Sequence, residues 1–137
     1  MFTVTARGVY GLSALIELAL NYQQGPKQIK DIASAHGIPQ HYLEQILVIL
    51  KKSGVVESFR GAQGGYALAR HPSRIQLLEV LSLLEGQLEV LPEQRQGNAL
   101  GFFWNALENR IRDFLDRSLE DLLLEMQSQQ SAMMYSI

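Results

Sequence analysis

The sequence predicts a mainly α-helical domain that carries one short β-hairpin and is followed by a long helix. Apolar residues recur at helical spacing through most of the first 55 residues. A glycine-dense turn near residue 60 separates two strand-like runs, and a second helical stripe runs through the last third of the chain. With 137 residues and 47% apolar content, the chain suffices for one compact domain or a small domain with an extension.

The first helix is predicted to begin after Thr5, a favourable N-cap residue, and to end before Gly25-Pro26. Gly8 and Gly11 lie three residues apart on this helix, which predicts a face that another backbone approaches closely. The apolar residues of the helix recur at helical spacing and are Val9, Leu12, Leu15, Ile16, Ala19 and Leu20.

Two further helices are predicted on either side of a tight connection at Gly37-Ile38. The shorter covers about residues 27–36, and Gly37 suits the left-handed position that follows a helix. Pro39 is tolerated in the first turn of the longer helix, which extends to about Ser53 and is closed by Gly54. The residues expected inside are Ile29, Ile32 and Ala33 in the shorter helix and Leu43, Ile46, Leu47 and Leu50 in the longer one. This arrangement predicts a helix-turn-helix.

The hairpin is predicted to join the runs 55–59 and 66–68. Gly61, Gly64 and Gly65 permit the positive φ values that a tight reversal needs. Arg60 leads the turn, and an exposed arginine suits a narrow, electronegative groove of nucleic acid. Taken alone, the same residues are equally consistent with an ordinary hairpin whose arginine is solvated. Because the hairpin follows a helix-turn-helix, we interpret it as a wing.

The helix at about residues 39–53 carries polar side chains outside its apolar stripe. These are Gln40, His41, Glu44 and Gln45 near its start and Lys51 and Lys52 at its end. Glutamine can bind adenine in a bidentate manner, glutamate can accept from the cytosine amino group, and lysines can reach phosphates. A solvated helix face has the same composition. The order of helix-turn-helix, basic helix end and glycine-rich hairpin favours a face that binds double-stranded DNA.

The net charge of -2 conceals an asymmetry along the chain. Residues 1–74 hold eight basic and four acidic side chains, a charge of +4, whereas residues 75–137 hold four basic and ten acidic ones, a charge of -6. The first part can neutralise phosphates and the second would repel them. This difference supports binding by the first part and assembly or regulation by the second.

Two motifs make the chain similar to a known family. Tyr42-Leu43-Glu44-Gln45 lies on the predicted third helix, and the wing reads Arg60-Gly61-Ala62-Gln63-Gly64-Gly65-Tyr66. Over about residues 1–125 the chain resembles the IscR/NsrR/CymR family of bacterial winged helix-turn-helix transcriptional regulators. The resemblance implies a homodimer that places recognition helices in the major groove and wings in the minor groove of an imperfect palindrome.

The resemblance also implies individual DNA contacts. His41, Tyr42, Glu44 and Gln45 correspond to contacts of the recognition helix, and Arg60 to the contact of the wing. Pro39 and His41 occupy positions where many relatives carry serine. The complete set that we predict to bind DNA is Gln40, His41, Tyr42, Glu44, Gln45, Lys51, Lys52, Arg60, Gly61 and Gly64.

After the wing, a fourth helix is expected from Ile75 to Leu84. Leu78, Leu81 and Leu84 are predicted to pack on the first helix. A loop at 85–99 then leads into the longest helix. We therefore divide the chain into a winged helix-turn-helix domain at 1–84, an equivalent of a sensor loop at 85–99, and a dimerisation helix with a tail at 100–137.

The longest helix carries an apolar stripe whose members alternate at spacings of three and four. Packing within one subunit would give the same pattern. However, the stripe extends beyond a domain that already has a core, which favours dimerisation, and the family resemblance implies the same. The residues predicted at the dimer contact are Trp104, Leu107, Ile111, Phe114, Leu115 and Leu122. Ser118 and Asp121 fit a capping box, so this helix is expected to break near residue 117 and restart.

The chain contains no cysteine, which excludes disulfides, thiolate metal sites and a cysteine nucleophile. In the best-known members of the family that it resembles, three cysteines in and after the loop hold an iron-sulfur cluster. Asn98 and Gly101 stand near ligand positions here and supply no suitable side chain. We therefore expect no cofactor, and we expect a protein or small-molecule effector to act at residues 87–98.

Other kinds of site are not favoured by the sequence. Glu89 and Glu93 could bind a hard cation, but two loop carboxylates are usually solvated, and His36, His41 and His71 lack metal-ligand spacing. No catalytic constellation is found, which predicts that the chain is not an enzyme.

Residues 12–20 are too short and too interrupted to span a membrane, and the start of the chain lacks signal-peptide features. We therefore expect a cytoplasmic protein that makes no membrane contact. One alternative function remains open. It is a protein-interaction module on a winged-helix scaffold, controlled by a partner and without strong operator specificity.

Overall fold

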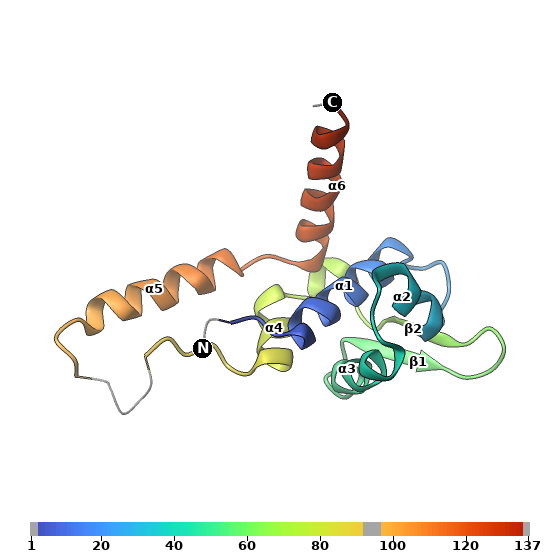
Figure 1. The fold of residues 1–137 in the computed structure, drawn as a ribbon, viewed down its shortest axis with the longest axis horizontal. Coiled ribbons are helices and arrows are strands. Elements are labelled where there is room, and N and C mark those ends of the chain that lie inside the picture. The colour runs from blue at the N-terminus through green and yellow to red at the C-terminus, as the bar shows by residue number, and fades with distance from the viewer. Residues whose placement is uncertain (1–2, 92–96, 136–137) are drawn as a thin grey trace.

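The computed structural model describes residues 3–91 and 97–135. Figure 1 shows a body formed by the first four helices and a hairpin, from which two further helices project. The elements are α1 (Ala6–Leu20), α2 (Ile29–His36), α3 (Gln40–Lys52), β1 (Val56–Phe59), β2 (Gly65–Leu68), the 3-10 helix η1 (Pro72–Arg74), α4 (Leu77–Glu85), α5 (Gly101–Phe114) and α6 (Leu119–Tyr135). The predicted mainly α fold with one hairpin is confirmed.

The hydrophobic core surrounds α1, which contacts the other three helices of the body, strand β2 and helix α6. Its largest fully buried side chains include Leu15 of α1, Leu43 and Leu47 of α3, and Val80 of α4. Each buried leucine or valine contributes about 1.5–3 kcal/mol by leaving water. Among the described residues, Leu119 is the one buried apolar side chain that lies beyond Leu84 in the sequence.

The start of α1 packs against the end of α4. A Cβ atom on Gly11 would lie 2.4 Å from Leu84 Cδ1, and one on Gly8 would lie 2.9 Å from Glu85 Oε1. The prediction that another backbone approaches this face was wrong, because the close neighbours of both glycines are side chains, chiefly of α4.

Glu85 links the end of α4 to the first turn of α1. Its carboxylate accepts hydrogen bonds from the Thr5 hydroxyl at 2.6 Å, the Thr5 amide at 3.0 Å and the Gly8 amide at 2.9 Å. The hydrogen bond from the Thr5 hydroxyl, helped by these backbone amides, lowers the pKa of Glu85 below its ordinary value. Thr5 is also the N-cap of α1, as predicted, because its hydroxyl accepts from the Arg7 amide.

The helix-turn-helix forms with small shifts of its predicted boundaries. Helix α2 begins two residues later than expected, because the backbone of Lys27 pairs with that of Tyr66 in the hairpin. Gly37 follows α2 in the left-handed region at φ 63°, as predicted. Pro39 occupies the N-cap position of α3 and not its first turn. Helix α3 ends at Lys52, with Gly54 at φ 75°.

Helix α4 differs from the prediction at its start and on its buried face. Ile75 and Leu77 pair with the backbone before α6, since the Leu119 amide donates to the Ile75 carbonyl at 2.8 Å and the Leu77 amide to the Arg117 carbonyl at 2.9 Å. This extended pairing delays the helix until Leu77. The fully buried residues of α4 are Leu77, Val80 and Leu84, so the expectation for Leu78 and Leu81, which are only partly buried, was wrong.

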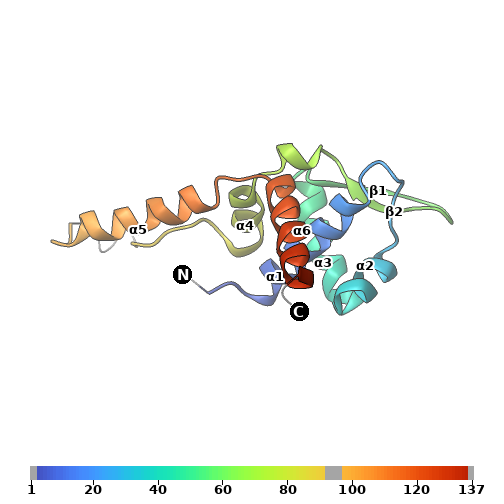
Figure 2. The same ribbon diagram turned by 90° about the horizontal axis from the view of Figure 1, so that it is seen from above.

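The predicted break after α5 is confirmed. The Ser118 amide donates to Asp121 Oδ2 at 2.9 Å and the Asp121 amide donates to Ser118 Oγ at 3.0 Å, which completes a capping box at the start of α6. The two helices point in different directions in Figure 1. Figure 2 shows α6 beside α1, while most of α5 projects away from the body. The predicted stripe is therefore divided between two helices and does not form one straight seam.

Candidate nucleic-acid interface

Helix α3 turns its polar side chains to solvent as the sequence predicts. Four buried residues, Leu43, Ile46, Leu47 and Leu50, hold its other face against the core. The exposed residues are Gln40, His41, Glu44, Gln45, Lys51 and Lys52. They present amides, a carboxylate, an imidazole and two ammonium groups along one side of the helix.

Tyr42 differs from the other predicted residues of α3 because its ring packs against the edge of the core. The ring is half-buried and lies edge-on to the ring of Tyr10, with centroids 5.7 Å apart and planes at 82°. Such edge-to-face pairs contribute about 0.5–1.5 kcal/mol beyond the area that they bury. Tyr42 thus anchors the start of α3 to α1.

The hairpin forms an antiparallel pair in the register Val56↔Leu68 to Phe59↔Gly65, and the turn between its strands carries Arg60. Arg60 and Gly61 are exposed, and Gly61 has a positive φ of 101° that favours glycine. Gly64 is buried, and a Cβ atom there would lie 2.3 Å from the Phe59 carbonyl oxygen. Gly64, which we predicted to bind DNA, therefore shapes the turn, and it also lines the groove between the hairpin and the helix-turn-helix.

The wing is attached to the segment that leads into α2. The Lys27 amide donates to the Tyr66 carbonyl at 2.9 Å, and the Tyr66 amide donates to the Lys27 carbonyl at 2.8 Å. Gly65 allows this contact, because a Cβ atom there would lie 2.3 Å from the Lys27 carbonyl oxygen. The Gln28 side-chain amide also donates to the Ala62 carbonyl at 3.1 Å. We did not predict these contacts, and the Gly64-Gly65 pair was the signal that could have indicated them.

A groove of about 340 Å³ separates the wing from the helix-turn-helix. It is lined by Gln28 and Lys30 from the start of α2, Gln40 from α3, and Gly61 and Tyr66 from the hairpin, among others. The structure thus brings the start of the predicted recognition helix and the predicted wing to two sides of one groove, with a lysine at its edge.

Apart from Arg7, whose charge helps to lower the pKa of Glu85, the lysines and arginines of the body fall into two groups. Lys27 is paired with Glu17, and Arg70 makes a two-pronged ion pair with Glu79 at 2.8 and 3.0 Å, so both hold the fold together. A second group is exposed and makes no side-chain hydrogen bond or ion pair within residues 3–91 and 97–135; it consists of Lys30, Lys51, Lys52, Arg60 and Arg74. Four of these five lie on α2, α3 and the wing turn, where they are free to bind phosphates.

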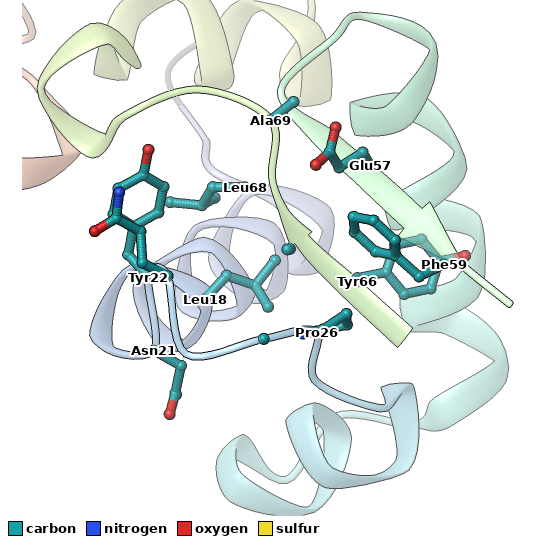
Figure 3. Close-up of a pocket in the computed structure, with 12 residues that line it drawn as sticks. Leu18, Asn21, Tyr22, Pro26, Glu57, Phe59, Tyr66, Leu68 and Ala69 are labelled. Atoms are coloured by element: carbon teal, nitrogen blue, oxygen red, sulfur yellow. The ribbon is translucent and has the colours of Figure 1, made fainter. Parts of the chain in front are cut away.

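A separate hollow of about 330 Å³ lies between the end of α1 and the hairpin. Figure 3 shows Leu18 and Pro26 on one side of it and Glu57, Phe59 and Tyr66 from the two strands on the other. None of the residues that we predict to bind DNA lines this hollow.

The part of the predicted effector segment that the structure describes lies along α5. The Val90 amide donates to Glu108 Oε1 at 3.0 Å, and Arg112 Nη2 donates to the Leu88 carbonyl at 2.9 Å. Leu88 also lines a mainly apolar hollow of about 240 Å³, together with Val4, Leu81, Ile111 and others. Residues 92–96, which include Glu93, lie outside the described residues.

The residues near the loop do not suit a cysteine-ligated cluster. Asn98 Oδ1 accepts a hydrogen bond from the Leu100 amide at 2.8 Å, and Gly101 is the first residue of α5. Neither supplies a thiolate, and the sequence has no cysteine. Within the described ranges, no group of three or more histidine or acidic side chains is arranged to hold a metal ion.

Helices α5 and α6 leave much apolar surface in water. Helix α5 contains no buried residue, and Phe102 and Phe114 are 74% and 68% exposed. Of the predicted dimer contacts, Trp104, Leu107 and Ile111 are partly buried, whereas Leu115 and Leu122 pack against the core of their own subunit. Over the part of the chain that is described, no helix has the length and apolar character needed to cross a bilayer.

Comparison with known proteins places this geometry in a family. Residues 4–125 match the profile of the Rrf2 family, which is described as an iron-dependent transcriptional regulator. CymR of Bacillus subtilis is 36% identical over 138 residues, which cover 98% of this chain and 99% of that protein. IscR of Xenorhabdus nematophila is 36% identical over 128 residues, which cover 88% of this chain and 78% of IscR.

Solved structures agree with these sequence relatives. The structure of CymR, the global cysteine regulator of B. subtilis, superposes with a TM-score of 0.81 at 36% identity and covers 91% of this chain and 98% of CymR. IscR of T. potens gives a TM-score of 0.80 at 35% identity and covers 94% of this chain and 91% of IscR. The named relatives are transcriptional regulators and not enzymes. The fold is the predicted winged helix-turn-helix.

Proposed function

Since the chain belongs to the Rrf2 family of transcriptional regulators, we propose that it binds an imperfect DNA palindrome as a homodimer and uses no cysteine-ligated iron-sulfur cluster. The observation that carries the proposal is the placement of exposed cations on α2, α3 and the wing that have no side-chain partner within the described residues, with Lys30 lining the groove between α3 and the hairpin. Cations that are not neutralised within the protein can replace the counterions of DNA phosphates.

In this proposal α3 enters the major groove. Gln40 and Gln45 each offer a side-chain amide that can bind adenine in a bidentate manner. Glu44 offers an acceptor for the cytosine amino group. Lys51 and Lys52 lie at the other end of the helix and reach phosphates.

The wing then reads the adjacent minor groove. In a DNA duplex, a phosphate backbone runs between the major groove and the minor groove. In this proposal that backbone lies in the protein groove between α3 and the hairpin, beside Lys30. Arg60 extends from the turn without a partner inside the described part of the protein and suits a narrow, A·T-rich minor groove.

The two arms formed by α5 and α6 hold the dimer together. Their exposed phenylalanine, leucine and methionine side chains form the apolar surface that a second subunit would cover. In a dimer of this kind the two recognition helices address half-sites about 34 Å apart, one helical turn, or a multiple of that distance.

Regulation acts through residues 87–98 in this proposal. Gln87 and Leu88 adjoin Glu85, whose carboxylate holds the first turn of α1, and Leu88 is hydrogen-bonded to Arg112 of α5. A small molecule or partner protein that moves this segment would change how the arm meets the body, and with it the spacing of the recognition helices. We place the protein in the cytoplasm, where bacterial DNA lies.

A second function has one observation in its favour. The chain from residue 75 onward carries a charge of -6 and contains the exposed apolar arms, which suit a protein partner. The protein would then be an interaction module on a winged-helix scaffold with little operator specificity.

A salt titration of binding to duplex DNA separates the two functions. For the regulator, we expect a strong preference for one palindrome and an affinity that falls steeply as salt rises. Genome-wide mapping of bound sites supplies the palindrome. Weak and equal binding to every duplex would exclude the regulator and support the interaction module.

Two variants test the assigned contacts. Arg60→Ala should weaken binding by about 1–3 kcal/mol, while Arg74→Ala, which removes an exposed arginine from η1, should weaken it less. Glu44→Ala should relax base preference more than total affinity. Unchanged affinity and salt dependence for Arg60→Ala would refute the wing contact, and unchanged selectivity for Glu44→Ala would refute base reading by that residue.

A further inference from the structure

Gln28 occupies the N-cap position of α2 but does not cap the helix. Its backbone is extended, at φ -71° and ψ 145°, and its side chain makes no capping hydrogen bond. Instead Nε2 donates to the carbonyl oxygen of Ala62, 34 residues further along the chain, at 3.1 Å. Serine, threonine, asparagine and aspartate are the residues that cap helices well. The side chain of Gln28 is therefore used for a contact with the wing turn and not for the local helix.

The wing turn has few other restraints. The strand ladder ends at the pair Phe59↔Gly65, and within the turn the Gly64 amide donates to the Gly61 carbonyl at 3.0 Å. Two backbone hydrogen bonds between Lys27 and Tyr66 attach strand β2 to the segment before α2, next to the last pair of the ladder. Residues 60–64 lie beyond this attachment, and a turn that is held only through its strands can move relative to the helices. The hydrogen bond from Gln28 to Ala62 adds a second attachment, in the turn itself.

This second attachment links the wing turn, through α2, to the recognition helix α3. Gln28 leads directly into α2, and α2 packs against α3. Ala62 lies two residues after Arg60, whose side chain has no partner within the described residues and takes its direction from the turn. The chain of contacts therefore runs from α3 through α2 and Gln28 to the segment that presents Arg60.

We propose that Gln28 is a positioning residue for DNA binding, whose side-chain amide holds the wing turn so that Arg60 meets the minor groove while α3 occupies the major groove. This inference rests on the proposed function. Gln28 acts through Arg60 and not through a contact of its own with a base.

The test is a double-mutant cycle on the mapped palindrome. Gln28→Met keeps the length of the side chain and removes the donor, and Gln28→Asn keeps the amide but shortens its reach. We expect either change to weaken binding about three- to tenfold, the worth of one hydrogen bond. In an Arg60→Ala background the same change should cost less than about twofold, because the group that Gln28 positions is gone. Gln24→Met, at an exposed glutamine before α2, serves as the matched control and should leave binding unchanged.

Two readouts separate positioning from a general loss of structure. Replacing the A·T pairs beneath the wing with G·C pairs should weaken the wild type strongly and Gln28→Met only slightly. In the free protein, the Gly64 amide of Gln28→Met should exchange with solvent faster than in the wild type, while the amide of Leu47 in α3 keeps its rate. A general loss of stability would accelerate both amides.

The outcomes distinguish this inference from the function on which it rests. If the wild type prefers no duplex, the proposed function fails. If the wild type is selective and Gln28→Met binds equally well, or if Gln28→Met costs the same factor with and without Arg60, the positioning role is refuted. Faster exchange at Gly64 combined with a loss of affinity that depends on Arg60 supports it.

Discussion

The body of the molecule and its two C-terminal helices use apolar side chains in opposite ways. In the body, from α1 to α4, most leucine, isoleucine and valine side chains pack around α1 and are almost completely buried, with Val9, Leu20 and Val48 as exposed exceptions. In α5 no residue is buried, and α6 buries Leu119 at its start while Leu124 is 58% exposed. The body thus satisfies its own hydrophobic requirement, whereas the arms expose surface that a second chain can cover.

This difference suggests that the body and the arms have separate roles, the body in DNA binding and the arms in contact with a partner chain. The core of the body, which Leu119 at the start of α6 completes, can hold the exposed face of α3 and the wing turn in place. Helix α5 and the exposed part of α6 can then change their partner without disrupting the surface that we propose binds DNA. Matched substitutions in the two regions should therefore have different effects.

The largest difference is expected between two leucines. Leu47 is fully buried in α3, and Leu47→Ala should reduce the free energy of unfolding by about 2–5 kcal/mol. Leu124 is exposed in α6, and Leu124→Ala should change the unfolding of the isolated subunit by less than about 0.5 kcal/mol. Urea denaturation at low protein concentration measures both. Equal losses would show that α6 belongs to the same core as the body.

The second comparison concerns association. Phe114 is 68% exposed on α5, and Phe114→Ala should weaken a dimer by about 2 kcal/mol, roughly a thirtyfold rise in its dissociation constant, if the ring lies at the centre of the contact. Asn109→Ala, an exposed polar position on the same helix, is the control and should have little effect. Analytical ultracentrifugation gives the two constants. If the wild type remained monomeric at all concentrations, the proposal that α5 and α6 form a dimer contact would be refuted.

The parts of the fold that could be predicted are those encoded by neighbouring residues. Thr5 caps α1, Gly37 and Gly54 follow α2 and α3 with positive φ, and Ser118 with Asp121 forms the capping box of α6. Each of these signals depends on a few adjacent residues and on backbone geometry that only some side chains permit. The polar face of α3 was predictable for a similar reason, since helical periodicity decides which side faces the core.

The parts that could not be predicted depend on pairs that are distant in sequence. The Lys27–Tyr66 and Gln76–Ser118 bridges delay the starts of α2 and α4, and no local pattern specifies these bridges. Residues of α4 are so uniformly apolar that periodicity did not identify the buried face. Tyr42 also suited a binding face in sequence, but the ring of Tyr10 lies beside it in space.

The third comparison is between two glycines of α1 and α5. Gly11→Ala would place a Cβ atom against Leu84 and should destabilise the body by about 1–3 kcal/mol, the usual cost of overpacking. A Cβ atom on Gly101 would point into open space, so Gly101→Ala should stabilise α5 by up to about 1 kcal/mol through helix propensity. Thermal unfolding reports the first change, and amide exchange within α5 reports the second. A stabilising effect of Gly11→Ala would refute the close packing of α1 on α4.

The smallest effects are expected from two carboxylates at low pH. On α1, Glu17 accepts hydrogen bonds from Lys27 and, at 2.9 Å, from His36, and its side chain is only 13% exposed. The hydrogen bond from Lys27 is the main reason why the pKa of Glu17 lies below its ordinary value of 4.5, and burial opposes this shift. A pKa lowered by folding means that the contribution to stability is complete above the unfolded value and is lost as pH falls through the folded value.

Glu17→Gln should therefore lower the stability of the body by about 1 kcal/mol near pH 7 and make stability depend less on pH below 4.5. Glu108 of α5 also has a lowered pKa, mainly because it accepts a hydrogen bond from the Val90 amide, but it joins only the 87–91 segment to the arm. Glu108→Gln should leave global unfolding unchanged and lower the protection factor of the Val90 amide against exchange, and acid should lower the same protection factor in the wild type. Glu108→Gln could instead alter the acid unfolding of the whole subunit as much as Glu17→Gln does. That result would show that α5 and the body unfold as one cooperative unit and do not differ in stability.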